Sequence, residues 1–359
     1  MSLAFSAYSQ KYEFQNVKDI ACTPVISQGA TGTCWSFSST SFLEAEIIRT
    51  TGKKIDLSEM YNVRHTYPKK AWNFVMRQGK AQFGEGGLNH DAINSAKNFG
   101  IVPASAYSGL VGNAQKHDHQ KMVDELENLL KPYADQAKKL DPKWKSEVNV
   151  VLDKYMGADI AEFTYEGKKY TPKSFLEMTK LNLNDYVTIT SFTNEPYYSS
   201  FILDIPDNFA NGSFYNMPLD EFVDNVDNAL EKGYTLALDA DISEKTFSGR
   251  EGIAVIPENN ADEKVILTEI KPEKKITPEF RQQEFENFNT TDDHLMHIVG
   301  KVKDQAGTIY YKVKNSWGTK NYANDGYIYM SVSYLRLKAI SVLLHKDGLI
   351  KTTKKQLGV

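Results

Sequence analysis

The feature that most constrains this chain is the segment QGATGTCWSF at residues 28–37, where glycines permit a turn directly before Cys34. The residues that follow, 36–49, repeat apolar side chains at helical spacing. The pattern predicts that Cys34 lies at or near a helix N-terminus, where free backbone N–H groups and the helix dipole favour a thiolate. Because the thiolate is the nucleophilic form of cysteine, Cys34 is a candidate nucleophile.

A buried structural cysteine is the alternative, since free cysteines are among the most buried residues. Two distant segments argue against it. Residues 293–300 read DHLMHIVG, with a histidine near the start of an apolar run, and residues 314–318 read KNSWG. Residues 308–314 alternate like a strand, so a hairpin would bring Asn315 beside His294. Cysteine, histidine and asparagine are the nucleophile, the general base and the orienting group of a thiol hydrolase.

Gln28 stands six residues before Cys34, and its amide could donate a hydrogen bond to an oxygen that turns negative during acyl transfer. With the cysteine, histidine and asparagine segments, in this chain order, it resembles the papain superfamily of cysteine peptidases. The segment EGGL at residues 85–88 is similar to the family's glycine pair, whose backbone pairs with the substrate. The resemblance implies that Gly86 and Gly87 bind substrate.

The expected roles follow from the residue types. His294 takes the proton of Cys34, and Asn315 accepts the other ring N–H and holds the tautomer. Trp317 shields that hydrogen bond from water. His297 is the rival base, but three residues along a strand its side chain faces the opposite way. The family pattern places the base directly after an aspartate, which favours His294.

The spacing between the cysteine and the histidine indicates a particular branch of the family. His294 follows Cys34 by 260 residues, whereas papain-type chains place the histidine about 130–150 residues downstream. About a hundred residues are therefore inserted between the halves of the catalytic domain. Residues 183–187, 216–222 and 236–241 resemble segments of the bleomycin hydrolase branch, also called aminopeptidase C. The chain is similar to a short bacterial-type member of that branch.

This resemblance implies an α+β fold with two lobes, one helical and one an antiparallel sheet or barrel, and a mostly helical insertion. The expected segments are the N-terminal arm and helical lobe with the nucleophile helix (1–103), the insertion that joins back to the catalytic fold (104–232), the β lobe with the histidine and asparagine (233–345), and the C-terminal tail (346–359).

The composition limits the partners. Hydrophobic residues make up 41% of the chain and charged residues 25%, which excludes a disordered chain and a membrane bundle. The net charge of −4 gives no reason to expect nucleic-acid binding, and no apolar run approaches the roughly 18 residues that span a bilayer. We expect peptide substrates and no membrane span. Because longer relatives in the branch form hexameric rings, a homo-oligomer is one expected state.

The two cysteines bear on chemistry and location. A bridge between Cys22 and Cys34 would consume the nucleophile, so Cys22 is interpreted as a small buried side chain. A chain without a disulfide framework suits a reducing compartment. Residues 1–5 show no signal peptide, so a cytoplasmic location is expected, or a periplasmic one if a leader was removed. Thiol chemistry needs no metal or other cofactor, and none is expected.

The C-terminal tail bears on specificity. In the bleomycin hydrolase branch this tail fills the non-primed subsites and leaves room for one residue with a free amine. The residues after Lys346 could span about 40 Å if extended, enough to reach the cleft. We therefore expect the Val359 carboxylate to pair with the substrate amine, which makes the enzyme an aminopeptidase gated by its tail. A frayed terminus, and with it a papain-like endopeptidase, is the alternative.

Two more distant functions stay open at this point. A transglutaminase-like acyl transferase also uses a thiolate and a histidine, but its third member is normally aspartate, and Gln28 together with the run from Asn315 to Trp317 argues against it. A non-catalytic binding module would keep the fold without the chemistry. Every catalytic position of the family pattern is intact, which argues against a binding module.

Overall fold

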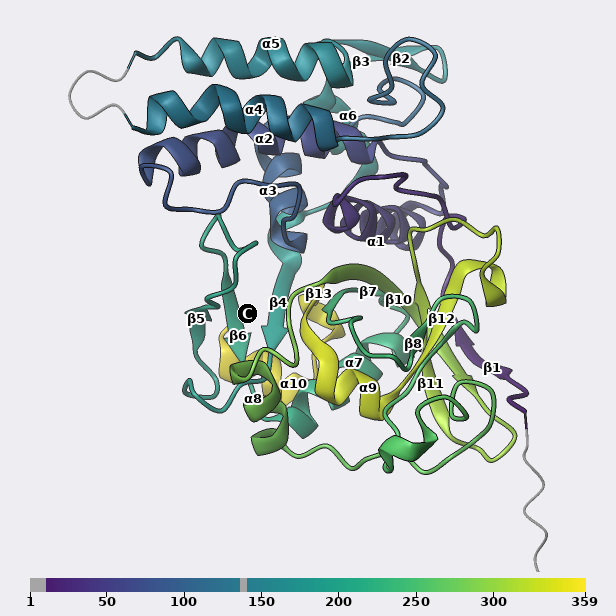
Figure 1. Ribbon diagram of the computed structural model, residues 1–359. Helices are drawn as coiled ribbons and strands as arrows, with labels where there is room; N and C mark the ends of the chain where they lie inside the picture. Colours follow the sequence, from purple (N-terminus) through teal and green to yellow (C-terminus); the bar gives the residue numbers. More distant parts are fainter. Residues whose placement is uncertain (1–10, 136–140) are drawn as a thin grey trace, which may run out of the picture.

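The computed structural model describes residues 11–135 and 141–359 as a mixed α+β structure around one large sheet (Figure 1). The helices are α1 (Cys34–Thr51), α2 (Glu59–Met76), α3 (Asn89–Phe99), α4 (Gln120–Ala134), α5 (Trp144–Met156), α6 (Pro172–Thr179), α7 (Leu219–Glu231), α8 (Pro278–Glu286), α9 (Val332–Lys338) and α10 (Lys351–Leu357). Short 3₁₀ turns occupy Leu183–Asp185, Asn260–Asp262, Ala323–Gly326 and Lys346–Gly348.

The strands are β1 (Gln15–Asp19), β2 (Phe163–Tyr165), β3 (Lys168–Tyr170), β4 (Tyr186–Thr190), β5 (Ser200–Ile202), β6 (Ser213–Asn216), β7 (Leu236–Ala240), β8 (Phe247–Ser248), β9 (Ile253–Ala254), β10 (His294–Lys303), β11 (Ile309–Lys314), β12 (Tyr327–Ser331) and β13 (Ala339–His345). In Figure 1, α2, α4 and α5 stack at one end of the molecule together with the small sheet of β2 and β3, and the strands of the large sheet fill the other end. The nucleophile helix α1 lies between them.

Helix α1 is buried along most of its length, with every residue from 34 to 47 buried. Because neighbours cover it on all sides, it lacks the single apolar stripe of a surface helix. Its hydroxyl groups bond to backbone oxygens, as when Ser38 Oγ donates to Met296 O at 2.5 Å. The helix ends at Gly52, whose φ of +71° is the left-handed conformation that glycine favours there. The predicted helix beginning at or near Cys34 is confirmed.

The large sheet has the order β5-β6-β4-β13-β7-β10-β11-β12-β9-β8, and β1 pairs with β10. Strands β10 and β11 form the predicted antiparallel hairpin, in which His297 pairs with Lys314. The first residue of β10 therefore lies beside the residue that follows β11. This geometry brings His294 and Asn315 to the same edge of the hairpin, as the sequence predicted.

The two faces of the sheet have different partners. Successive residues of β7 point to opposite faces. Leu238 and Ala240 join the core that includes residues of α7 and α9. Ala237 joins a different core, which includes Phe42 of α1. Asp239 therefore lies on the α1 face of the sheet, although all of β7 is buried.

The four expected segments stay predictions, but their contents are now visible. Residues 104–232 contain α4 to α7 and β2 to β6. Helices α4 and α5 pack on α2, whereas β4 and β6 continue the large sheet next to β13. The expected insertion thus contributes both to the helical end and to the sheet.

The C-terminal tail, which could span about 40 Å if it were extended, is instead largely helical, because residues Lys351–Leu357 form α10. At 1.5 Å per residue this helix covers only about 10 Å. Thr353 is buried, and its hydroxyl donates to Glu221 of α7 and accepts from Asn225 Nδ2 at 3.1 Å. Val359 packs against the sheet core. Helix formation and docking on α7 shorten the reach of the tail.

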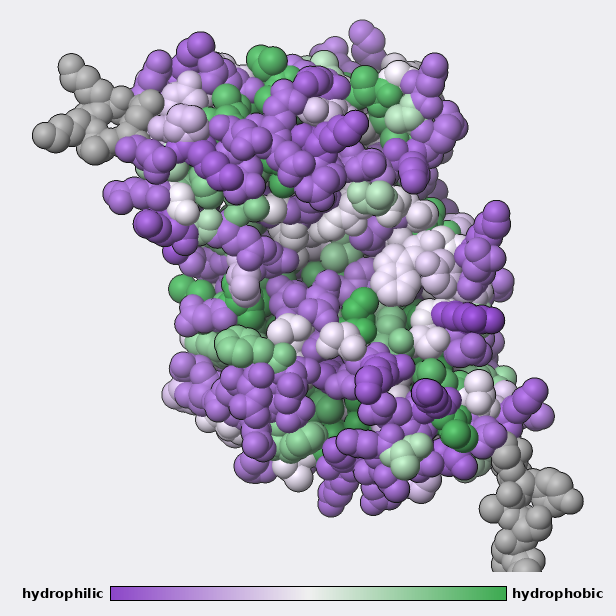
Figure 2. All heavy atoms as spheres, viewed as in Figure 1, coloured by the Kyte–Doolittle hydropathy of each residue, from purple (hydrophilic) through white to green (hydrophobic). Residues whose placement is uncertain are grey.

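The surface agrees with this two-part arrangement. In Figure 2 hydrophilic side chains cover most of the visible face, and less hydrophilic residues gather between the helical end and the strands. None of the helices within residues 11–135 and 141–359 has the length and apolar character that crossing a bilayer requires.

Candidate active site

Cys34 is the first residue of α1 and is 7% exposed. Glu85 holds the turn before it, since Gly32 N–H donates to Glu85 Oε2 at 2.6 Å and Trp35 Nε1 donates to Glu85 O at 2.9 Å. On the other side, the backbone N–H of Leu295 donates to the Cys34 sulfur. The candidate nucleophile is therefore fixed between the start of α1 and the start of β10.

His294 begins β10 and Asn315 directly follows β11. His294 Nε2 donates to Asn315 Oδ1 at 2.7 Å, because an amide oxygen can only accept. A neutral ring then keeps its lone pair on Nδ1, the nitrogen that can take a proton. The Trp317 ring stacks on His294, with centroids 5.0 Å apart and planes 28° apart. The structure thus brings His294, Asn315 and Trp317 together, while their roles in catalysis stay predictions.

Gln28 is 7% exposed and is fixed to the segment after β11. Its backbone N–H donates to Ser316 O at 2.8 Å, and its Oε1 accepts from Ser316 Oγ at 2.5 Å. Gln28 Nε2 donates to Thr31 O at 2.6 Å. The amide has a second N–H, and the backbone N–H groups of a first helical turn have no partner within the helix. Gln28 and Cys34 thus carry the donors that the predicted oxyanion hole needs.

The Cys34 thiol lies in an environment that opposes ionisation. Burial raises its pKa to about 12, and the Leu295 N–H opposes this rise. The carboxylates of Asp292, Asp207 and Asp239 contribute smaller parts of this rise in the pKa. Three acidic residues therefore lie close enough to the sulfur to act on it electrostatically.

Burial also lowers the pKa of His294 to about 4, against the opposing hydrogen bond to Asn315. Both shifts favour the uncharged thiol and imidazole in the free protein. Burial and the nearby carboxylates thus act against the stabilisation of a thiolate by the helix N-terminus.

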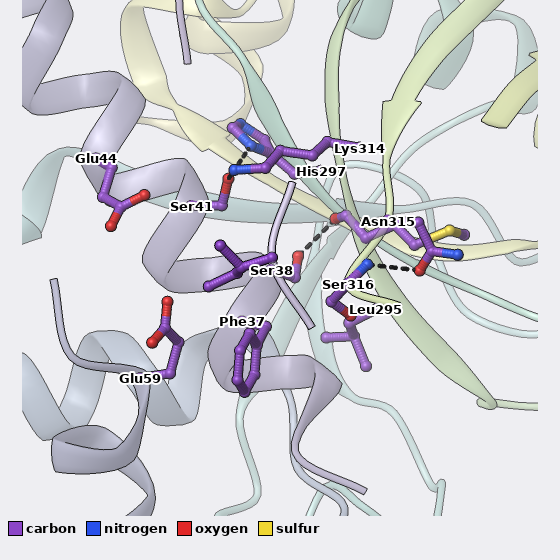
Figure 3. A pocket seen from close by; sticks show the side chains of 12 residues that line it. Phe37, Ser38, Ser41, Glu44, Glu59, Leu295, His297, Lys314, Asn315 and Ser316 are labelled. Atoms are coloured by element: carbon purple, nitrogen blue, oxygen red, sulfur yellow. Dashed lines mark hydrogen bonds between the residues drawn. The ribbon is translucent and has the colours of Figure 1, made fainter. Parts of the chain in front are cut away.

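A polar network lies behind α1, around a small cavity of about 20 Å³ (Figure 3). Lys314 Nζ donates to Ser41 Oγ at 2.7 Å and to Thr23 Oγ1 at 2.9 Å. Thr23 in turn donates to the Glu44 carboxylate, and Ser41 Oγ is hydrogen-bonded to His297 Nδ1 at 2.8 Å. The rival base His297 is thus held in this network. Because Lys314 precedes the asparagine, the network also fixes the end of β11 to α1.

The predicted glycine pair borders the turn that carries Cys34. A methyl group at Gly87 would approach the Trp35 ring to 3.2 Å, and one at Gly86 would lie 1.9 Å from the Asp207 carboxylate. The Lys70 ammonium donates to Gly86 O. Space therefore favours glycine at both positions, and their role in substrate binding stays a prediction.

Val359 follows the last turn of α10, and its backbone N–H donates to Lys354 O at 3.2 Å. It lies in a hollow formed by residues of α3, β4, β6 and β13, with His90, Tyr186 and Lys346 among its lining. The three predicted catalytic residues are not among the described residues that line this hollow. The predicted pairing of the Val359 carboxylate with substrate stays a prediction.

Sequence reasoning missed four acidic residues of the site, namely Glu85, Asp207, Asp239 and Asp292. One signal was available, because Asp239 interrupts the apolar run of a buried strand. The other three reach the site from loops, which carry no periodic pattern. In the described part of the chain, no three His, Cys, Asp or Glu side chains are grouped so as to hold a metal ion.

Comparisons with known proteins found similar sequences and a similar fold. A profile of the Peptidase C1-like family matches residues 73–358, which include His294 and Asn315. Aminopeptidase G of Lactobacillus delbrueckii subsp. lactis is 23% identical over 379 aligned positions, covering 93% of this chain and 83% of that protein. A probable cysteine protease of Arabidopsis thaliana is 34% identical over 116 positions, covering 30% of each chain.

Among solved structures, pepW from Lactobacillus rhamnosis HN001 superposes with a TM-score of 0.77 at 18% identity. The superposition covers 96% of this chain and 84% of pepW. The predicted α+β fold is therefore confirmed.

Proposed function

This chain belongs to the Peptidase C1-like family, and we propose that it is a cysteine-type aminopeptidase that releases the first residue of peptides. The predicted kinship with the papain superfamily and its aminopeptidase C branch is confirmed. One observation carries the proposal: a histidine held at 2.7 Å by an asparagine lies at the strand end next to a cysteine that begins a buried helix.

In the proposed reaction, Cys34 attacks the carbonyl carbon of the first peptide bond as its proton passes to Nδ1 of His294. Asn315 keeps Nε2 protonated and holds the ring in place. The Cys34 backbone N–H and the Gln28 amide donate to the oxyanion, each stabilising the transition state by about 3 kcal/mol.

Collapse of the tetrahedral intermediate breaks the C–N bond, and His294 returns the proton to the departing amine. The first residue stays on Cys34 as a thioester. His294 then takes a proton from water, whose oxygen attacks the thioester, and the thiol is restored. The stacked Trp317 ring keeps water away from the histidine–asparagine hydrogen bond during both steps.

The experiment is peptide hydrolysis by the wild type and by Cys34→Ala, His294→Ala and Asn315→Ala variants, with substrates that carry free or acetylated N-termini. We expect cleavage of the free-amine substrates by the wild type and loss of cleavage in the cysteine and histidine variants. An epoxide thiol inhibitor should label the wild type and not Cys34→Ser. Full activity of either the Cys34→Ala or the His294→Ala variant would overturn the assignment of roles.

The tail remains part of the proposal as a second element that could restrict the cleft to free N-termini. Deleting residues 356–359 should lower cleavage of free-amine substrates and raise cleavage of acetylated ones if the Val359 carboxylate binds the amine. An unchanged preference would show that the tail does not set specificity. A wild type that prefers acetylated peptides would instead identify a papain-like endopeptidase.

Location and assembly are further parts of the proposal. Both cysteines are free, which fits a reducing compartment such as the cytoplasm. A homo-oligomer stays a prediction, and sedimentation velocity tests it directly.

A further inference from the structure

Three carboxyl groups act electrostatically on Cys34, and one of them lies against the glycine pair. Asp207 comes from the loop between β5 and β6, Asp239 from the middle of β7, and Asp292 from the segment just before β10. Asp239 pairs across the sheet with Leu295, the Asp207 carboxylate lies against Gly86, and Asp292 is hydrogen-bonded to Asp239. We call this group the acidic subsite.

Asp207 closes one side of the acidic subsite. Its carboxylate lies so close to Gly86 that a methyl group there would meet Oδ2 at 1.9 Å. Gln82 Nε2 donates to Asp207 Oδ1 at 3.2 Å and helps to hold the carboxylate there. The acidic side chain therefore covers the first glycine of the pair, where an extended peptide would otherwise continue.

Asp239 is the member of the acidic subsite that comes from strand β7. It lies on the α1 face of β7, opposite Leu295, whose N–H donates to the Cys34 sulfur. The residue is 0% exposed, and its carboxyl group is hydrogen-bonded to that of Asp292, which requires a proton on one of the two. Neither Asp239 oxygen accepts from any other described residue. The two carboxyl groups are thus buried side by side and bonded to each other, without a donor from another kind of residue.

The charges around the acidic subsite are not balanced by the protein. Asp207 is influenced by Lys70, whose ammonium donates to Gly86 O. The charged groups that act on Asp239 and Asp292 are all carboxylates, including Asp293. Buried carboxylates without partners are costly, and proteins normally pair them with a cation. A site that keeps them unpaired is suited to a cation that arrives with a ligand.

We propose that Asp207, Asp239 and Asp292 bind the α-ammonium group of the first residue of the substrate. This inference rests on the proposed function. In a peptide the α-nitrogen is separated from the first peptide carbonyl carbon by one Cα atom, so it must lie close to the nucleophile. The acidic subsite lies at that place, and Asp207 covers the glycine pair where a residue preceding the first would bind.

The same contact would prepare the nucleophile. In the free protein the three carboxylates oppose ionisation of Cys34. A bound ammonium group offsets their charge, so the thiol loses its proton to His294 more readily in the complex. A substrate with a blocked amine brings no such charge. The acidic subsite therefore links recognition of a free N-terminus to activation of Cys34.

The experiment compares leucine anilide, N-acetyl-leucine anilide and N-acetyl-lysine anilide as substrates of the wild type, Asp239→Asn and Asp207→Asn. The control is Asp204→Asn, which makes the same change at an exposed position of the same loop. We expect kcat/KM for leucine anilide to fall about 30-fold or more in the two test variants, because one partner of a buried charge pair is lost. Cleavage of the acetylated leucine substrate should be unchanged or faster, and the control should match the wild type.

A second readout does not depend on turnover or on the substrate. Iodoacetamide should alkylate Cys34 faster in Asp239→Asn and Asp207→Asn than in the wild type at the same pH, since a carboxylate that opposes the thiolate is gone. Faster alkylation also shows that the variant keeps a folded site, and Asp204→Asn should again match the wild type.

Three results would overturn the inference, and they differ from failure of the proposed function. Equal loss on free and acetylated leucine substrates would assign the carboxylates a structural role. A preference for N-acetyl-lysine anilide that the variants lose would assign the acidic subsite to a side-chain ammonium. If the wild type prefers leucine anilide over its acetylated form and both variants keep the same preference, the substrate amine is recognised at another place. By contrast, a wild type without any preference for free amines would contradict the aminopeptidase function itself.

Discussion

Two groups of buried acidic side chains flank the nucleophile helix, and the residues around them treat them differently. Behind α1, Glu44 accepts from the Leu57 N–H at 2.8 Å and from Thr23, which links it to the Lys314 ammonium. In the acidic subsite, Asp239 is bonded only to the carboxyl group of Asp292 and has no donor from another kind of residue; we call such a carboxyl group unpartnered. The partnered carboxyl groups join α1 to the sheet, whereas the unpartnered ones are available to a cationic ligand.

The largest expected effect comes from removing the cation of the network behind α1. Lys314→Met removes the donor to Thr23 and Ser41 and leaves Glu44 buried without its cation. We expect the free energy of unfolding to fall by about 3 kcal/mol, measured by urea denaturation.

The matched control lies two residues away on the same strand. Lys312 forms an ion pair with Asp19 at 2.8 Å, and the Asp19 side chain is 54% exposed. Lys312→Met should therefore cost no more than about 1 kcal/mol. Equal effects of the two substitutions would remove the contrast between the network behind α1 and an ordinary surface ion pair.

Substituting an acid of the acidic subsite should change the free energy of unfolding in the opposite direction. Asp239→Asn removes an acid whose pKa burial raises well above its usual value, so the native protein must keep a proton that the unfolded chain releases at pH 7. We therefore expect the free energy of unfolding at pH 7 to rise by about 2 kcal/mol. Glu44→Gln should lower it, because that carboxylate has donors. A loss of stability in both variants would show that the two groups of acids are alike.

The gain in Asp239→Asn should depend on pH. Burial raises the pKa of Asp239 well above its usual value, and burial also raises the pKa of Asp292 to about 7. A raised pKa in the folded state means that the native protein holds the proton more tightly than the unfolded chain does. The free energy of unfolding then falls as pH rises from about 4 towards 7. The difference between the variant and the wild type should grow over that range in urea titrations.

A smaller effect is expected where the acidic subsite meets the glycine pair. Gly86→Ala places a methyl group against the Asp207 carboxylate and should displace it. We expect cleavage of free-amine substrates to fall about 10-fold, equivalent to roughly 1.4 kcal/mol, with little change for acetylated ones. Gly87→Ala meets Trp35 instead, so it should not change the ratio between the two substrates. Matching effects on that ratio would argue against the position of Asp207 in recognition.

The sequence predicted those parts of the site that local patterns encode. Helical spacing after Cys34 indicated α1, and strand alternation before Asn315 indicated the hairpin that carries His294. These elements are contiguous, so period and turn residues suffice to identify them. The residues that define the acidic subsite could not be found in this way, because contacts between distant segments bring them together.

Two elements show where local reasoning failed. Helix α2 was not predicted, and it contains Pro68 and polar residues such as Asn62 that are buried by its neighbours. The tail was expected to extend, but α10 gains its stability from α7, through Thr353 and Asn225. In both cases tertiary packing decides a structure that the local sequence only weakly favours.

The most direct test of the central claim is the rate at which an amino-acid chloromethyl ketone alkylates Cys34. Leucine chloromethyl ketone and its N-acetyl form present the same side chain and the same reactive carbon, and differ in the charged amine. We predict that the free-amine reagent reacts about 30-fold faster with the wild type and that this ratio falls towards one in Asp239→Asn. A ratio that is the same in both proteins would contradict the claim that unpartnered carboxylates beside Cys34 recognise the substrate amine.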